Sequence, residues 1–513
     1  MKHASKLLAL ALALALAFGM MSAVSAETVD IPGADTVDLS KEVALQTWII
    51  GDTAVDKDMV YEKINGLLKE RLNTTIELNY IPWSDAGTRY QLLFAGGEEF
   101  DQCYTAFWTS PGYKQLAVQG AFMPLTEEML TTYAPKAYAQ LSQAAINQNL
   151  VNGVLYTFPK SGRAYDYKTV VMIRGDLREK YGLDEVKTLD DLNNYLHVIA
   201  ENEEGMVPYQ VEGDSSMLMS IYYTQANNIE RLTSANIIVD IDDSLEDHDK
   251  EYMLMVDDPR FHDYLVMMKD WRDSGIIPSD ALSQTATSGQ GAAFTSGRSA
   301  MFAWNVNILN AYNTTMAEHP EWKPEIIDVA DFEGTLSFPT PYRDGIALSP
   351  DTENWQRCLM VQEQIRNDQQ LYDWFQFGLE GVHWNPVGDD KYELLPDSGN
   401  FPANSSFQWG IVTDMQRTSV TYPQSYIDIE QHWKDTHYDY VMNGFSMDTT
   451  NVAPIQAVLS TLWDEYYKPL SLGAVEDIDA TLAEWKSKME QAGLDQYVDE
   501  AMNQIFAYAD MMR

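Results

Sequence analysis

The sequence predicts an α/β protein of at least two lobes, and three observations indicate this class. The chain has 513 residues, several times the length of one typical domain. Helix-like and strand-like segments alternate along it, which is typical of sheets covered by helices. Hydrophobic residues make up 45% of the chain, enough for large cores and too many for bulk disorder.

The first elements form a β-α-β unit. A strand is predicted over 43–50, where apolar and other side chains alternate and Gly51-Asp52 ends the run. A helix follows over 60–72 with apolar residues at helical spacing, and a second strand covers 76–80. Such a unit predicts parallel strands, with ligands held at their carboxyl ends.

The later elements continue the alternation of helix and strand. Near the C-terminus, Asp477 can cap a helix that carries Trp485, Gly493 ends this helix, and a last helix follows. The other expected helices are 91–95, 113–119, 176–181, 189–199, 257–273 and 354–366, and the other expected strands are 100–108, 169–173, 299–304 and 345–348.

The charge excludes some partners. The formal net charge is −43, so this surface should repel nucleic acids and bilayers rich in anionic lipid. Among small ligands, the charge favours neutral or cationic ones. The two cysteines cannot staple a small disulfide scaffold, and Cys103 and Cys358 are expected to be buried free thiols, with a disulfide as the alternative.

The N-terminus is typical of an export signal. Lys2 and Lys6 precede an apolar run over 7–21, and small residues lead to a cleavage site after Ala26. The run is shorter than the ~20 residues that span a bilayer, which disfavours a membrane anchor. Residues 1–26 are therefore predicted to be a signal peptide and 27–40 a linker. The mature chain is expected to be exported, and no cysteine lies near the cleavage site to support lipidation.

Several motifs together resemble the extracellular solute-binding proteins of ABC importers, family 1, carbohydrate type. They occur in order along nearly the whole expected mature chain, and the segment 443–513 resembles the C-terminal region of Firmicute lipoproteins in this family. The motifs are Trp48-Ile49-Ile50-Gly51-Asp52, the run from Leu93 through Ala95-Gly96-Gly97 to Trp108, Leu155–Pro159 leading to Ile173–Leu177, Ser296–Met301 before Trp304, and Gly378–Trp384.

The resemblance implies the two-lobed periplasmic-binding-protein-like II fold, with a ligand cleft between lobes that close about a hinge. By this analogy lobe one is 41–160 with 340–440, and lobe two is 161–339 with 441–513. The implied hinge segments lie near Phe158-Pro159, Pro339–Pro341 and Tyr440–Gly444. The implied ligand is a carbohydrate, with an oligosaccharide preferred, although peptide and polyamine binders share this fold. The implied partner is an ABC permease. A monomer without metal, cofactor or catalytic residue is expected.

Aromatic residues bear on the ligand class. A sugar ring has an apolar face that an indole can cover and a polar rim that fixed donors and acceptors satisfy. Trp48, Trp108 and Trp304 lie at or near the carboxyl ends of predicted strands, and Trp83 closely follows another. Any one Trp is more often a core residue, but four at strand ends favour a sugar cleft containing at least two of them.

Polar residues near the same ends complete the candidate set. Asp52 is a hydroxyl acceptor or a turn residue, and Arg163 contacts ligand hydroxyls or a carboxylate, or forms a surface ion pair. The candidate ligand-binding residues are Trp48, Asp52, Trp83, Trp108, Arg163, Tyr165, Tyr167, Trp304, Asn305, Glu380 and Trp384.

Other chemistries have weaker support. The acids from Asp240 to Glu251 partly match a calcium loop, but Leu245 occupies the position that requires Gly, so a solvated hairpin is preferred. His432 and His437 are five residues apart, unlike a zinc helix. A secreted glycoside hydrolase is the alternative function. It needs two carboxylates about 5–5.5 Å apart if retaining or about 6.5–9.5 Å apart if inverting, and 77 acidic residues neither supply nor exclude such a pair.

Overall fold

The structure is a computed structural model. It describes residues 31–511 apart from short internal segments. The residues outside the description are 1–30, 108, 110, 161–167, 212–215, 234–236, 241–252, 284–288, 333, 335–337, 340–343, 404–408, 410–414, 439–440 and 512–513. The predicted signal peptide, most of the partial calcium loop, and Trp108, Arg163, Tyr165 and Tyr167 therefore lie outside the described residues.

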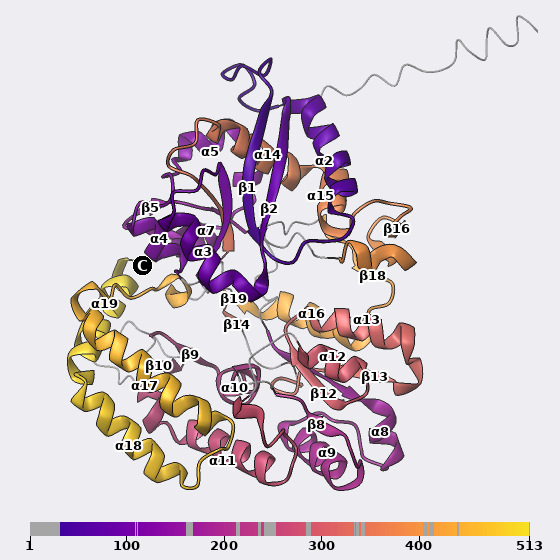
Figure 1. The fold of residues 1–513 in the computed structure, drawn as a ribbon, viewed down its shortest axis with the longest axis vertical. Coiled ribbons are helices and arrows are strands. Elements are labelled where there is room, and N and C mark those ends of the chain that lie inside the picture. Colours follow the sequence, from indigo (N-terminus) through magenta and orange to yellow (C-terminus); the bar gives the residue numbers. More distant parts are fainter. Residues whose placement is uncertain are drawn as a thin grey trace, which may run out of the picture.

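Lobe one is built on a five-stranded sheet with the order β2-β1-β3-β15-β6 (Figure 1). Strand β1 (Val43–Ile50) pairs in parallel with β2 (Thr74–Ile81) and β3 (Gln102–Ala106), as a β-α-β start requires. Strand β15 (Asp344–Leu348) runs antiparallel between β3 and β6 (Phe158–Pro159), so a distant part of the chain completes this sheet.

Helices cover this sheet, and the residue that follows α2 shows how such a helix is ended locally. Helix α2 (Lys57–Leu72) ends where Asn73 adopts a left-handed conformation, φ 49°, and the Asn73 N–H donates to Lys69 O. The other helices of lobe one are α3 (Ala86–Ala95), α4 (Tyr113–Val118), α5 (Glu127–Tyr133), α6 (Pro135–Ala139), α7 (Gln143–Gln148), α14 (Trp355–Asn367) and α15 (Gln369–Phe377).

Lobe two is built on a four-stranded sheet with the order β13-β7-β12-β8. Strand β7 (Val170–Arg174) runs antiparallel to β12 (Ser299–Trp304) and β13 (Pro324–Ile327), and β8 (Val207–Tyr209) is parallel to β12. The surrounding helices are α8 (Gly175–Lys180), α9 (Leu189–Asn202), α10 (Ser216–Met219), α11 (Pro259–Asp273), α12 (Gly289–Thr295), α13 (Ile308–Glu318), α16 (Gln424–Thr436), α17 (Ala453–Ser471), α18 (Ile478–Gln491) and α19 (Leu494–Met511).

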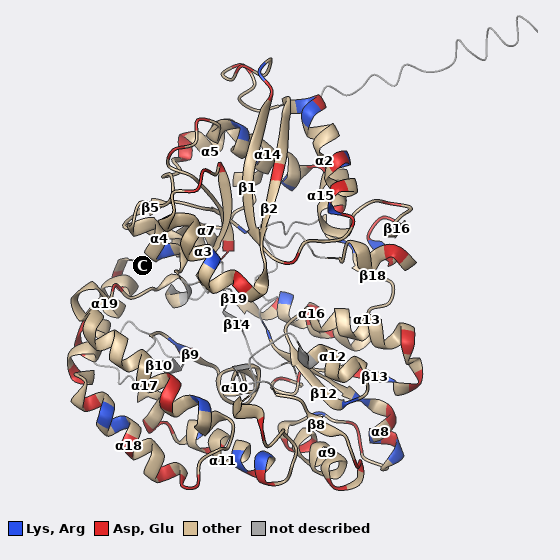
Figure 2. Cartoon of the chain, viewed as in Figure 1, with Lys and Arg blue, Asp and Glu red and all other residues tan. Residues whose placement is uncertain are grey.

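The C-terminal helices form part of the main core of lobe two. That core joins side chains from 171–329 to others from 442–509, whereas the lobe-one core draws on 43–158 and 346–409. Asp477 accepts a hydrogen bond from the Ala480 N–H at 2.9 Å, which confirms the predicted cap of α18. Figure 2 shows acidic residues in both lobes, with basic residues among them on α8 and α18.

Helix α16 corrects one predicted boundary. The sequence placed 340–440 in lobe one, but α16 packs against β13, and its Trp433 lies in a second core of lobe two with Val170 and Phe302. Assigning 424–436 to lobe one was therefore wrong. The chain returns to lobe two before α16, because the apolar face of this helix is buried there.

Two of the segments between the lobes pair with each other. Strand β14 (Phe338–Pro339) is parallel to β19 (His437–Tyr438), and both lie between the two large sheets (Figure 1). This two-stranded ribbon contains Pro339, the first residue of one predicted hinge segment, and ends two residues before another begins at Tyr440. Together with the two sheets, it gives the chain the two-lobed α/β architecture that the sequence predicts.

The two cysteines are free and buried. Cys103 lies in β3 and Cys358 in α14, and burial raises the pKa of both thiols. The prediction of buried free thiols is therefore confirmed.

Candidate functional site

The lobe-one part of the candidate site lies at the carboxyl ends of β1 and β2. The Gly51 N–H donates to Ile81 O at 2.8 Å, so the two strand ends lie together. Asp52 follows β1 and is exposed, and Trp83 follows β2 with 44% of its surface exposed. An exposed indole at this edge is available to cover an apolar ligand face.

Trp48 is placed differently from the other predicted indoles. It lies within β1, packs against the lobe-one core, and has the guanidinium of Arg89 5.5 Å from its ring centroid. Arg89 belongs to α3. This arrangement leaves Trp48 half-buried in the sheet, two residues before the strand end.

The lobe-two part of the site lies at the end of β12. Trp304 is the last residue of this strand, is half-buried, and stacks on Phe302 with ring centroids 6.0 Å apart. Asn305 follows, and its side-chain oxygen accepts the Asn307 N–H at 3.0 Å. Because Trp304 is in register with Val170 of the antiparallel strand β7, the residues just before β7 lie at the same edge.

A polar cluster at this edge was not recognised in the sequence. Lys168 precedes β7, Asp328 and Asp331 follow β13, and His432 and Trp433 come from α16. His432 Nε2 lies 2.9 Å from Asp331 Oδ2, and the Trp433 indole N–H donates to Asp328 Oδ2 at 3.0 Å. These residues are distant in the chain, so no local pattern could have grouped them.

Burial shifts the pKa of two members of this polar cluster, Lys168 and Asp328. Desolvation raises the pKa of Asp328, although Lys168 and the Trp433 hydrogen bond oppose the rise. Desolvation lowers the pKa of Lys168 to about 7, with Asp328 and Asp331 opposing the fall. An amine and a carboxyl group therefore lie close together in a weakly solvated place at the sheet edge where Trp304 ends β12.

A π-helical turn fixes the start of β7. In η3 (Ser220–Gln225), the Gln225 side-chain oxygen accepts the Thr169 N–H at 2.8 Å, and its amide donates to Thr169 O at 3.0 Å. Both backbone groups of Thr169 are thus held by one side chain. These two hydrogen bonds fix the backbone between Lys168 of the polar cluster and Val170, the register partner of Trp304.

Two predicted site residues lie in a hairpin of lobe one. Trp384 begins β16 (Trp384–Val387), is 2% exposed, packs with Phe377 and Tyr392, and donates its indole N–H to Gly378 O at 3.0 Å. This burial contradicts the prediction that Trp384 contacts the ligand. Its neighbour Glu380 is exposed and bridges to Trp384 through the backbone.

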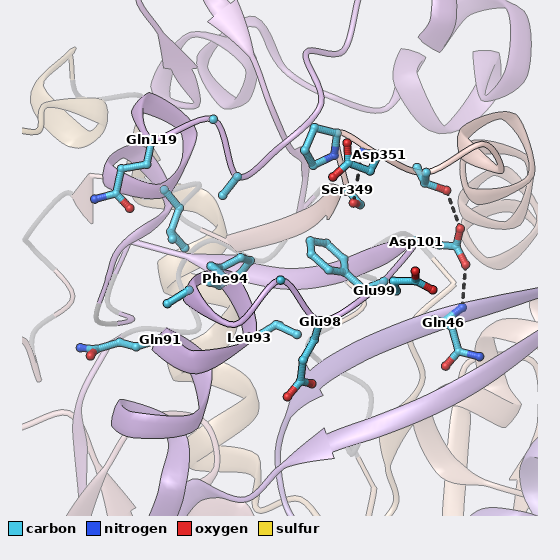
Figure 3. A pocket seen from close by; sticks show the side chains of 18 of the residues that line it. Gln46, Gln91, Leu93, Phe94, Glu98, Glu99, Asp101, Gln119, Ser349 and Asp351 are labelled. Atoms are coloured by element: carbon cyan, nitrogen blue, oxygen red, sulfur yellow. Dashed lines mark hydrogen bonds between the residues drawn. The ribbon is translucent and has the colours of Figure 1, made fainter.

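A hollow of about 1,000 Å³ lies elsewhere on lobe one (Figure 3). It is next to Asp101 before β3 and Ser349 after β15, so it lies at the opposite end of the sheet from Trp83. Asp101 accepts the Gln46 N–H at 2.8 Å and the Asn354 amide at 3.0 Å, which ties three chain segments together. The hollow is separate from the strand ends that the sequence singled out.

The described residues contain neither a metal-binding cluster nor a candidate membrane span. Within 31–511 and outside the gaps given above, no group of three or more His, Cys, Asp or Glu side chains could hold a metal ion. Over the same residues, none of the helices has the length and apolarity that crossing a membrane requires.

The comparisons assign a family. The model of the bacterial extracellular solute-binding protein family matches residues 52–354, more than half of the chain, and this protein belongs to that family. A domain of unknown function (DUF3502) matches residues 441–510, the segment that contains α17, α18 and α19.

Particular relatives come from Streptococcus pneumoniae. A carbohydrate ABC transporter substrate-binding protein of serotype 4 (strain ATCC BAA-334 / TIGR4) is 20% identical over 467 residues, which is 89% of each chain. The N-glycan transport solute-binding protein NgtS has a similar crystal structure, with a TM-score of 0.71, 18% identity, and coverage of 92% of this chain and 99% of that one. Its complex with Man5GlcNAc matches with a TM-score of 0.68, 18% identity and the same coverage.

Proposed function

We propose that this protein captures a carbohydrate between its two lobes and delivers it unchanged to the permease of an ABC importer. The observation that carries the proposal is the likeness to sugar-binding relatives over nine-tenths of the chain. One of these relatives, NgtS, has been crystallised in complex with the glycan Man5GlcNAc. An oligosaccharide is accordingly the ligand class we assign.

The described site residues support this ligand class. Trp83 offers an exposed indole on lobe one and Trp304 a half-buried one on lobe two. Asp52 and Asn305 stand beside them and can accept or donate hydrogen bonds to hydroxyls. We propose these four residues as ligand contacts. Trp108, Arg163, Tyr165 and Tyr167 remain predictions from the sequence.

The mechanism we propose is closure about the segments that join the lobes. The ribbon of β14 and β19 supplies a short, paired connection about which the lobes can rotate. Closure would bring the two strand-end edges together around the sugar and remove its apolar face from water. We further propose that the chain is exported by its N-terminal signal and acts as a monomer.

A thermal-shift screen of the purified chain tests the proposal. The ligands are mannose-containing N-glycan fragments, neutral oligosaccharides, alginate oligosaccharides and peptides. A ligand that binds the folded state at 100 times its Kd raises the free energy of unfolding by about 2.7 kcal/mol. We expect this stabilisation with an oligosaccharide, together with unchanged sugar on chromatography after incubation.

The same experiment tests the alternative function. A glycoside hydrolase would release shorter sugars in amounts exceeding the protein. Stabilisation by peptides alone would contradict the ligand class, and catalytic release of product would contradict the receptor.

A further inference from the structure

The C-terminal region of lobe two also touches lobe one. The turn η9 (Val441–Gly444) packs against α7 of lobe one and against α19 of its own region. Figure 1 shows the C-terminal end of the chain beside α4, at the border between the lobes. This contact is separate from the ribbon of β14 and β19.

Gly444 is tightly packed between the two lobes in this contact. A Cβ atom added to this residue would lie 2.4 Å from Gln148 Cα of α7 and 2.3 Å from the Tyr508 hydroxyl of α19. Real Cβ atoms are not found so close to other heavy atoms, so the backbone of Gly444 fits only without a side chain. One element of lobe one and two of the C-terminal region therefore meet at van der Waals distance.

Lys114 joins the same contact from lobe one. This α4 residue donates its ammonium to Gly444 O, and the nitrogen lies 5.3 Å from the ring centroid of Phe107 and 5.6 Å from that of Tyr508. A carbonyl and two aromatic faces are suitable partners for a poorly solvated cation. Burial lowers the pKa of Lys114 to about 8, which agrees with this placement. One aromatic partner belongs to each lobe.

The contact also reaches the candidate ligand edge. Phe107 directly follows β3 and stacks on Tyr113 with ring centroids 5.6 Å apart and planes 11° apart. The buried Thr109 hydroxyl lies 2.9 Å from both Ala106 O and Pro111 O, which makes the loop compact. This loop leaves the same sheet edge as Asp52 and Trp83. Lys114 therefore contacts the first residue of the loop that leaves this edge.

We propose that residues 441–511 form a clasp, which ties lobe two to lobe one through Lys114, Gly444 and Tyr508. Lys114 is a positioning residue in this clasp. It sets the resting separation of the lobes and the loop that follows β3, without touching the ligand itself. The effect on ligand affinity rests on the proposed function, whereas the effect on lobe separation does not.

The decisive experiment measures lobe separation without ligand. Spin labels are placed at Glu70→Cys on α2 and Glu201→Cys on α9, both exposed, and the buried native cysteines do not compete. Distances are then recorded by double electron–electron resonance in Lys114→Met, in Tyr508→Leu, and in the control Lys63→Met, which changes an exposed lysine of α2.

The clasp predicts that the distance between the spin labels differs between the two clasp variants and the control. Lys114→Met and Tyr508→Leu should broaden the distance distribution and shift it to larger separations, while Lys63→Met should match the parent. Identical distributions in all three variants would overturn the clasp, since packing alone would change the melting temperature and leave the distances unchanged. If the first two variants do not fold, native-state hydrogen exchange of the parent decides. The amides of α4, α7 and η9 should then open together, and independent opening of η9 would overturn the clasp.

A ligand titration separates this inference from the proposed function. Only the competent fraction of molecules binds, so a more open resting state raises the apparent Kd. For the oligosaccharide that stabilises the parent, we expect Lys114→Met to raise Kd by about three- to tenfold. An unchanged Kd would contradict the link to the ligand edge. If the parent binds no sugar, the proposed function fails while the distance measurement still decides the clasp.

Discussion

The imidazole of His432 lies 2.9 Å from the Asp331 carboxylate, Nε2 to Oδ2, and joins α16 to the loop that leaves β13. The Asp331 side chain is 1% exposed and that of His432 is 22% exposed. Beside them, Trp433 bonds the buried Asp328. These two hydrogen bonds hold helix α16 on lobe two, just before the chain enters β19.

We expect His432→Ala to destabilise lobe two. The substitution removes one hydrogen-bond partner from a buried carboxylate, at a cost of about 1–3 kcal/mol. Urea unfolding followed by tryptophan fluorescence measures the change. The control is Gln431→Ala, because Gln431 is exposed and bonds Asp435 on the same helix. Equal stability of both variants would contradict the role of the His432–Asp331 contact.

Lys168 should make the free energy of unfolding increase with pH above about pH 7. Its pKa falls from the ordinary 10.5 to about 7 in the folded chain, so between these values the unfolded state binds more protons. The free energy of unfolding therefore rises with pH across this window. In Lys168→Met the rise should be smaller, as measured by urea titrations at pH 7, 8 and 9. If the free energy of unfolding changed with pH equally in both proteins, the lowered pKa of Lys168 would be refuted.

Arg366 should be essential for the strand that leads to the first interlobe segment. It is fully buried, donates to Pro159 O of β6 at 2.8 Å, and stacks 4.1 Å from the Phe158 ring centroid. Glu363 lies nearby, and burial lowers the pKa of the guanidinium to about 9. Arg366→Met leaves the buried Pro159 carbonyl without this donor, which costs about 1–3 kcal/mol. Differential scanning calorimetry measures the loss, and a change below about 1 kcal/mol would be inconsistent with this role.

The two tryptophans Trp83 and Trp384 should separate binding from stability. Trp83→Ala removes a 44% exposed indole, so stability should change by less than about 0.5 kcal/mol while sugar affinity falls about tenfold. Trp384→Ala removes a buried indole and should cost about 3–5 kcal/mol of stability with the ligand Kd nearly unchanged in the folded fraction. Calorimetric titration and thermal melts measure both effects. The reverse pattern would invalidate our assignment of the two indoles.

Local pattern predicted six of the nine strands in the two large sheets and missed β6, β8 and β13. The alternation over 43–50 and the apolar spacing over 60–72 correspond to β1 and α2, because one buried face per element leaves its period in the sequence. Strands β14 and β19 have two residues each, too few to show a period. Helix α16 was not among the predicted helices, and the lobe that covers its apolar face is set by tertiary packing against β13.

The candidate site was only partly predictable. Trp83 and Trp304 could be located because parallel strands present their carboxyl ends at one edge. Trp384 was misassigned, since a Trp after a helix looks the same in sequence whether a hairpin buries it or not. The polar cluster joins Lys168, Asp328 and His432 from three distant segments, and only the tertiary fold brings them together.

Small-angle X-ray scattering with and without a saturating oligosaccharide tests the central claim most directly. Two lobes that close on a sugar should give a smaller radius of gyration in the complex, with the sugar recovered intact afterwards. An unchanged radius at saturation, or a sugar recovered in shorter pieces, would contradict a receptor that closes around its ligand and releases it unaltered.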